Sequence, residues 1–111
     1  PICHSMADQR VILGQVAPQA AADTLLFSAT TETTVSTLFA CATSGAVTIR
    51  IWVRRKGDAT SLKQYLYYEE PLAGPETMAV TAGITLGVGD DIMVRCSAAT
   101  VAFSAFGTVK S

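Results

Sequence analysis

The chain has 111 residues and a formal net charge of −1 at pH 7, and half of its residues are hydrophobic while 15% are charged. This length suits one domain. The net charge is too small to attract nucleic acid or an anionic membrane, and no apolar run approaches the roughly 18 residues that a membrane-spanning helix needs. The charged fraction is below the roughly 25% of typical soluble domains. We therefore expect part of the neutral or apolar surface to contact another subunit.

Apolar and β-branched runs alternate along the chain with compact Gly, Pro and Asp turns, which is typical of short strands. We expect an irregular N-terminal arm over residues 1–9 and a single domain over residues 10–111. Strands are predicted at 10–17, 24–28, 33–42, 47–54, 63–69, 77–81 with a kinked continuation, 91–97 and 101–109. Gly14 indicates a bulge in the first of them. Seven or eight short strands predict an all-β fold, an antiparallel β-sandwich of jelly-roll type.

Alternation within the strands predicts which side chains share a face. At 47–54, one set is expected in the core and the other in solvent or against a partner: Val47, Ile49, Ile51 and Val53, then Thr48, Arg50, Trp52 and Arg54. At 33–42, one face is expected to hold Val35, Thr37, Phe39 and Cys41. At 101–109, Val101, Phe103 and Ala105 are expected to face away from Ala102, Ser104 and Phe106.

The three cysteines, Cys3, Cys41 and Cys96, show neither CxxC nor His-paired spacing. Their odd number and spacing signal neither a disulfide framework nor a zinc site. We expect Cys41 and Cys96 to be small apolar core residues. A bridge between them requires that their strands be neighbours.

No constellation of catalytic residues is visible. The single histidine, His4, lies in the predicted arm, where it is a poor general base for a nucleophile. The acidic pairs Glu69–Glu70 and Asp90–Asp91 are adjacent residues, which point to opposite faces of a strand and so cannot flank a sugar as glycosidase carboxylates do. We therefore expect no enzyme activity, no metal and no cofactor.

Arg54, Arg55 and Lys56 form the one basic cluster of the chain. This cluster fits an acidic protein surface, and it fits equally a solvated loop tip that discourages edge pairing. Nucleic-acid binding is disfavoured because no aromatic residues are interleaved with the cluster.

Aromatic residues are the other interface candidates. Trp52 lies on the arginine face of its predicted strand, and Tyr65 and Tyr67 are expected to share one strand face. Together with Phe106 they are candidate anchors for a protein interface. The tyrosines are also suited to stacking on a sugar, or to closing the sandwich ends with their hydroxyls in water.

Two stretches, DTLLFSATTETTVSTLFACATSGAVTIRIWV and KQYLYYEEPLAGPETMAVTAGITLGVGDDIMVRCSAATVAFSAFGTV, carry a family resemblance. Their Thr-rich first hairpin, YLYY-like strand, Pro/Gly turn and final ITL…GD.I.VR.S…FS.FG segment resemble a group of small virion proteins of tailed bacteriophages. The resemblance covers most of the chain, from about Gln15 to Val109, and leaves the N-terminal arm unmatched.

This resemblance implies a non-enzymatic β-sandwich structural protein of the virion, made in the host bacterial cytoplasm. A capsid decoration (cement) protein is the leading expectation, as a homo-oligomer, with a trimer favoured, on the major capsid protein. A neck, tail, baseplate or fibre component is the alternative within that class. A carbohydrate-binding module for host adhesion is the alternative of another class. The resemblance carries over no catalytic residue.

Overall fold

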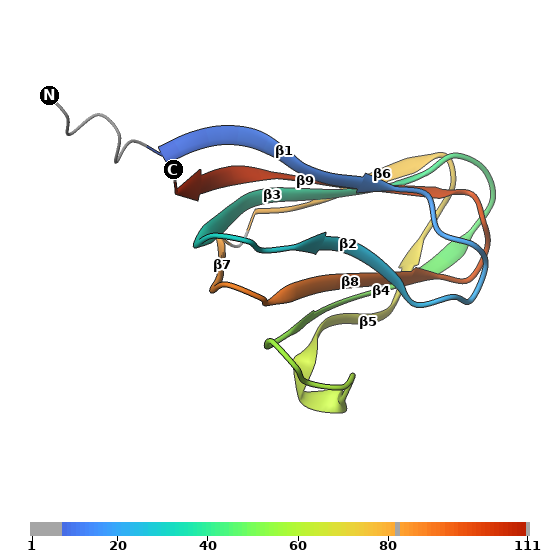
Figure 1. Ribbon diagram of the computed structural model, residues 1–111. Helices are drawn as coiled ribbons and strands as arrows, with labels where there is room; N and C mark the ends of the chain where they lie inside the picture. Colours follow the sequence, from blue (N-terminus) through green and yellow to red (C-terminus); the bar gives the residue numbers. More distant parts are fainter. Residues whose placement is uncertain (1–7, 82, 111) are drawn as a thin grey trace, which may run out of the picture.

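The computed structural model describes residues 8–81 and 83–110, which form nine strands and one short 3-10 turn (Figure 1). The strands are β1 (Asp8–Val16), β2 (Thr24–Ser28), β3 (Thr33–Ala42), β4 (Val47–Arg54), β5 (Tyr65–Leu72), β6 (Glu76–Val80), β7 (Ile84–Leu86), β8 (Asp91–Cys96) and β9 (Val101–Lys110). The turn, η2 (Leu62–Gln64), precedes β5.

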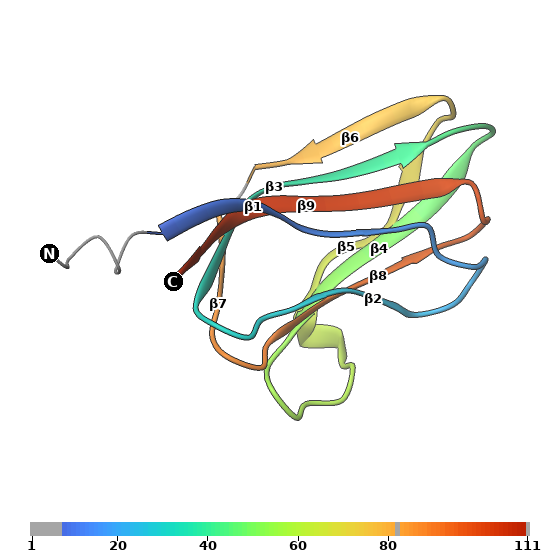
Figure 2. The same ribbon diagram turned by 45° about the horizontal axis from the view of Figure 1, so that its top comes forward.

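Two antiparallel sheets pack face to face (Figures 1 and 2). Sheet A has the order β1-β9-β3-β6, with β7 also paired to β3, and sheet B has the order β2-β8-β4-β5. The prediction of an all-β antiparallel sandwich is confirmed.

The strands pair as in a long hairpin that is folded over on itself. The later strands return antiparallel beside the first four, so that β4 pairs with β5, β3 with β6, β2 with β8 and β1 with β9. The chain crosses from one sheet to the other between successive strands, except from β4 to β5 within sheet B and from β6 to β7 within sheet A. The middle strands are β9 and β3 in sheet A and β8 and β4 in sheet B. One edge of sheet A is β1 and the other is formed by β6 and the short β7, while β2 and β5 are the edges of sheet B.

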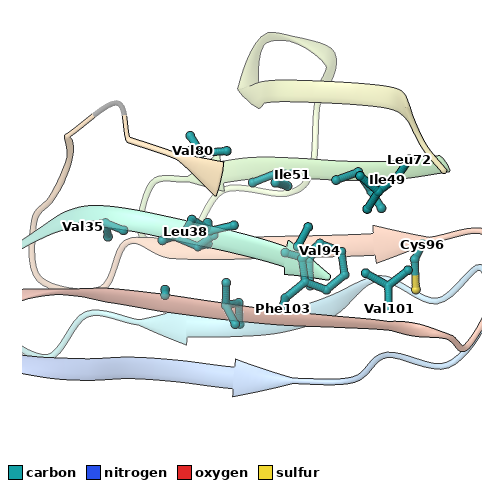
Figure 3. Close-up of a cluster of buried hydrophobic side chains, with 14 of the residues drawn as sticks. Val35, Leu38, Ile49, Ile51, Leu72, Val80, Val94, Cys96, Val101 and Phe103 are labelled. Atoms are coloured by element: carbon teal, nitrogen blue, oxygen red, sulfur yellow. The ribbon is translucent and has the colours of Figure 1, made fainter. Parts of the chain in front are cut away.

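The core lies between the two sheets and is built from the inward sets of strand residues (Figure 3). Ile49 and Ile51 from β4 meet Phe103 from β9 there, each with at most 1% of its surface exposed. Complete burial of such a side chain contributes about 1.5–3 kcal/mol. The predicted inward set of β4 is confirmed, except that Val53 is half-buried at the end of its strand, and in β9 the predicted alternation is confirmed, with Val101, Phe103 and Ala105 on the buried side.

Two predicted boundaries were wrong. The arm was expected to extend to residue 9, but β1 begins at Asp8 and pairs with β9 as far as Lys110; residues 1–7 lie outside the described part. The kinked strand expected from 77 onward is two strands, β6 and β7, which pair with different parts of β3. Both differences come from pairing with β9 and β3, partners that are distant in the sequence.

Bulges reset the alternation in two strands of sheet A. In β1 the register shifts between Ile12 and Gly14, as expected from Gly14, whose missing Cβ would overlap the carbonyl oxygen of Leu26 in β2. In β3 the register shifts between Val35 and Thr37. Val35 is therefore buried, on the opposite side of the sheet from Thr37. The prediction that these two share a face was wrong.

Candidate functional site

The outer face of sheet A is almost free of charge, and we call it the neutral face. Residues directly opposite each other in neighbouring strands point to the same side, and the registers place on this side Ile12 and Gln15 of β1, Thr34, Thr37, Phe39 and Cys41 of β3, Thr77 and Ala79 of β6, and Ala102, Ser104, Phe106 and Thr108 of β9. Among the described side chains of this face, the charges lie at one end: Arg10 of β1 and Lys110 of β9, which pairs with Glu32.

An open groove of about 650 Å³ crosses one end of the neutral face. It is lined by Arg10, Val11, Ile12, Ser36, Phe106, Gly107 and Thr108. Ile12 is 60% exposed and Val11 37% exposed. The Phe106 ring meets Phe39 edge to face, with 5.8 Å between ring centroids, so that two aromatic rings form the apolar centre of the face. Phe106 thus lies on the outer side, as its alternation predicted.

The outer face of sheet B is different because it holds three arginine–carboxylate pairs. Arg50 Nε lies 2.6 Å from Glu69 Oε2, Arg54 Nη2 lies 3.1 Å from Asp91 Oδ2, and Arg95 Nη1 lies 2.9 Å from Asp23 Oδ1. The hydrogen bond to Glu69 raises the pKa of the Arg50 guanidinium, so Arg50 stays charged. We call this side of the sandwich the charged face.

Trp52 was expected to be an exposed anchor on the arginine side, and this was wrong. It points to the outer side of sheet B, yet its exposed fraction is 0%. Residues 55–64 fold back over it: the indole Nε1 donates to Thr60 Oγ1 at 3.1 Å, and the Tyr65 ring packs at 5.1 Å. Met93, its neighbour on β8, is also buried. Trp52 is the centre of a second, smaller core, and the loop that covers it removes it from any interface.

The expected pairing of Tyr65 with Tyr67 on one face was also wrong. Register shifts in β5 set Tyr65 opposite Trp52 and Tyr67 opposite Ile51. Tyr67 therefore packs against the main core, and Tyr65 packs on the outer side. Tyr68, 55% exposed, meets Tyr65 edge to face at 4.9 Å and carries the Arg50 guanidinium 4.4 Å above its ring. The two-tyrosine platform expected for a sugar does not form.

The basic cluster is divided by the fold. Arg54 is bound within the domain to Asp91. Lys56 donates its backbone N–H to Asp90 Oδ1 at 3.0 Å, and its stem lies so close to Gly89 that an added Cβ there would meet it at 2.6 Å. Arg55 remains exposed.

Arg55 faces a cleft between the sheets together with Lys63, which the sequence analysis missed. The cleft measures about 460 Å³ and is lined by Val53, Arg55, Asp58, Lys63, Gln64, Leu66, Thr85 and Asp90. Both cations are exposed. The loop over Trp52 brings them together, and no local pattern in the sequence signals that return.

Cys41 and Cys96 lie on different sheets; Cys3 lies outside the described residues. Cys96 is buried in the core as expected, and burial raises the pKa of its thiol. Cys41 was expected in the core but is only half-buried, opposite Ala102 and Thr77 on the neutral face. Both thiols are free, so the bridge left open by the sequence does not form.

Three of the four residues in the two acidic pairs make structural contacts. Asp90 accepts hydrogen bonds from the backbone N–H groups of Lys56 and Gly87, which makes it a turn residue as expected. Asp91 and Glu69 each pair with an arginine. Among the described residues, no three His, Cys, Asp or Glu side chains gather as metal ligands; His4 lies outside this part of the chain.

No helix in the described ranges has the length and apolar character needed to cross a membrane. Comparison of the chain with protein-family models, with curated proteins and with solved structures gave no match.

Proposed function

We propose that this chain is a structural, non-enzymatic protein of a tailed-bacteriophage virion, a decoration protein that binds the head shell as a homo-oligomer. The observation that carries the proposal is the neutral face, a sheet surface that holds two aromatic rings and an exposed Ile12 and whose described charges, Arg10 and Lys110, lie at one end. Surfaces depleted of charge and enriched in aromatic residues are typical of protein interfaces.

The pairing scheme supports a jelly-roll assignment. In a jelly roll an antiparallel ribbon wraps into two four-stranded sheets, and here the outgoing strands β1 to β4 pair one by one with returning strands. Capsid proteins use this architecture widely, which agrees with the resemblance of the sequence to phage virion proteins.

The proposed mechanism is multivalent attachment. Copies associate through the neutral face, and Arg55 with Lys63 at the cleft contacts acidic side chains of the shell. Each contact is weak, and many contacts on a repeating lattice add through effective concentration. Arg54 has no part in this contact because Asp91 already neutralises it.

Immunogold electron microscopy of purified particles, with an antibody to this chain, tests the location. Dense label over the head supports a decoration protein. Label confined to the neck, tail or fibres moves the chain to the other structural role, and particles without label overturn the virion assignment.

Occupancy on particles tests the electrostatic contact. We expect Arg55→Glu with Lys63→Glu to lower the copy number per particle without unfolding the domain. The control is Lys110→Glu, an exposed lysine outside the cleft that pairs, among the described side chains, with the exposed Glu32. Equal occupancy of the double variant and the control would remove the cleft from the mechanism.

A further inference from the structure

Strand β1 leaves one long edge of sheet A open. Among the described strands, β1 pairs with β9 alone, so the backbone groups on its other side have no strand partner. It runs for nine residues, Asp8–Val16. Two of its apolar side chains, Val11 and Ile12, are 37% and 60% exposed. An exposed, apolar strand edge is a template for pairing with another strand.

The other three edges carry features that oppose such pairing. β2 and β6 have only five residues each, and the register of β2 shifts between Leu25 and Phe27. β5 has two register shifts and contains Pro71, which lacks a backbone N–H. The single shift in β1 lies between Ile12 and Gly14, which leaves the stretch from Asp8 to Ile12 regular. Of the four edges, β1 is therefore the one suited to accept a strand.

We propose that β1 pairs antiparallel with β1 of a second copy, so that two A sheets join into one continuous sheet across a twofold axis. Main-chain hydrogen bonds hold such a junction, and the side chains beside it add specificity. Ile12 and Phe106 line the groove next to this edge, so the junction also covers the most exposed apolar part of the neutral face. The inference deepens the homo-oligomer of the proposed function and rests on it in that respect.

Charge favours a second copy as the occupant. A twofold junction sets each side chain against its own kind or a near neighbour, so like charges on the strand repel. β1 contains two charged residues, Asp8 and Arg10, which have opposite signs and lie near one end of the strand. Any register that is not centred on either of them avoids setting two like charges opposite each other. A strand without net charge meets its own copy at little electrostatic cost.

Sedimentation equilibrium of the purified chain tests the pairing, with Ile12→Lys as the perturbing variant. Lysine on an edge is a natural block to strand addition, and the exposed position of Ile12 keeps the monomer folded. We expect dimerisation to weaken by roughly tenfold or more. The control is Leu25→Lys, which alters a 49% exposed side chain on the β2 edge of sheet B and should leave dimerisation unchanged.

Hydrogen–deuterium exchange of the unaltered chain gives a second readout that does not depend on folding of a variant. Amides of residues 8–14 should become protected as protein concentration rises, while amides of β2 stay unchanged. A chain that is monomeric at all concentrations overturns the proposal, as does a dimer whose protection maps to another surface.

Particle labelling and self-association are separate measurements. A monomeric chain that still decorates heads overturns only the strand junction. A β1-linked dimer that is missing from particles overturns only the virion role. If the β1 amides become protected only after shell protein is added, the β1 edge binds the shell protein. That result would overturn the proposal that a second copy of the chain binds there.

Discussion

Replacing Trp52 by alanine separates a core role from an interface role for this side chain. The indole is fully buried, donates to Thr60 Oγ1 at 3.1 Å and packs on Tyr65. Truncation of a buried tryptophan to alanine costs about 3–5 kcal/mol of unfolding free energy. A domain of this size has about 5–15 kcal/mol in total. The substitution therefore removes a large fraction of the stability, whereas loss of an interface anchor would leave the monomer intact.

Urea unfolding followed by far-ultraviolet circular dichroism measures this loss, because the variant has no tryptophan for fluorescence. The matched control is Tyr68→Ala, which removes a 55% exposed ring from the same side of sheet B and should change stability by about 1 kcal/mol or less. Thr60→Val leaves the buried indole N–H without its acceptor and should cost about 1–3 kcal/mol.

Fluorescence of the unaltered chain checks the same burial directly. Trp52 is the single tryptophan, so its emission should lie at short wavelength and resist quenching by iodide. A Trp52→Ala variant that loses less than about 1 kcal/mol, together with an indole that iodide reaches freely, would refute the small core beneath residues 55–64.

Four further outcomes follow from the structure. Gly107→Ala should destabilise the domain by several kcal/mol, roughly 3 or more, because an added Cβ would lie 2.9 Å from the Cα of Val35 and overlap the adjacent strand; thermal unfolding measures it. Native alkylation followed by peptide mapping should modify half-exposed Cys41 and spare Cys96. Burial raises the pKa of the Cys96 thiol in the fold. The stabilisation from this neutral thiol is therefore complete below the ordinary thiol pKa and is lost as pH rises through the raised pKa. The slope of unfolding free energy against pH in that alkaline range should be smaller in Cys96→Ala. Glu69→Gln should cost less than about 1 kcal/mol in urea unfolding, because its ion pair with Arg50 is exposed to solvent.

Sequence reasoning succeeded where one strand face is buried and the alternation is unbroken. In β4, β8 and β9 the apolar residues recur at every second position, and a one-residue slip would place all of them in water. The free-energy cost of such a slip depends on the residues of one strand, so the sequence alone predicts which side chains of these strands are buried.

The same reasoning failed at bulges and beneath the covering loop. The bulge in β3 moved Val35 to the core side, and the shifts in β5 separated Tyr65 from Tyr67. A bulge is set by the partner strand as much as by its own residues. The burial of Trp52 depends on a loop held over sheet B by the hydrogen bond that the Trp52 indole donates to Thr60. Periodicity within a strand carries no information about such a loop.

The neutral face was anticipated only as a property of the composition. A charged fraction of 15% implied neutral surface somewhere, but the position of that surface follows from the strand order. β1, β9, β3 and β6 are not consecutive in the chain, yet they contribute adjacent rows of one face. The ribbon pairing gathers these rows on one side of the sandwich, while the arginines of β4 and β8 lie on the other.

This division predicts opposite responses of the two proposed contacts to salt. The groove beside β1 is lined by uncharged residues apart from Arg10, so added salt should leave self-association nearly unchanged. Docking through Arg55 and Lys63 depends on exposed charges, whose attraction is screened beyond about 8 Å at physiological ionic strength. Occupancy on particles should therefore fall as salt rises while the dimer persists. A dimer that dissociates in the same salt range would indicate that charged groups, and not the neutral edge, hold the copies together.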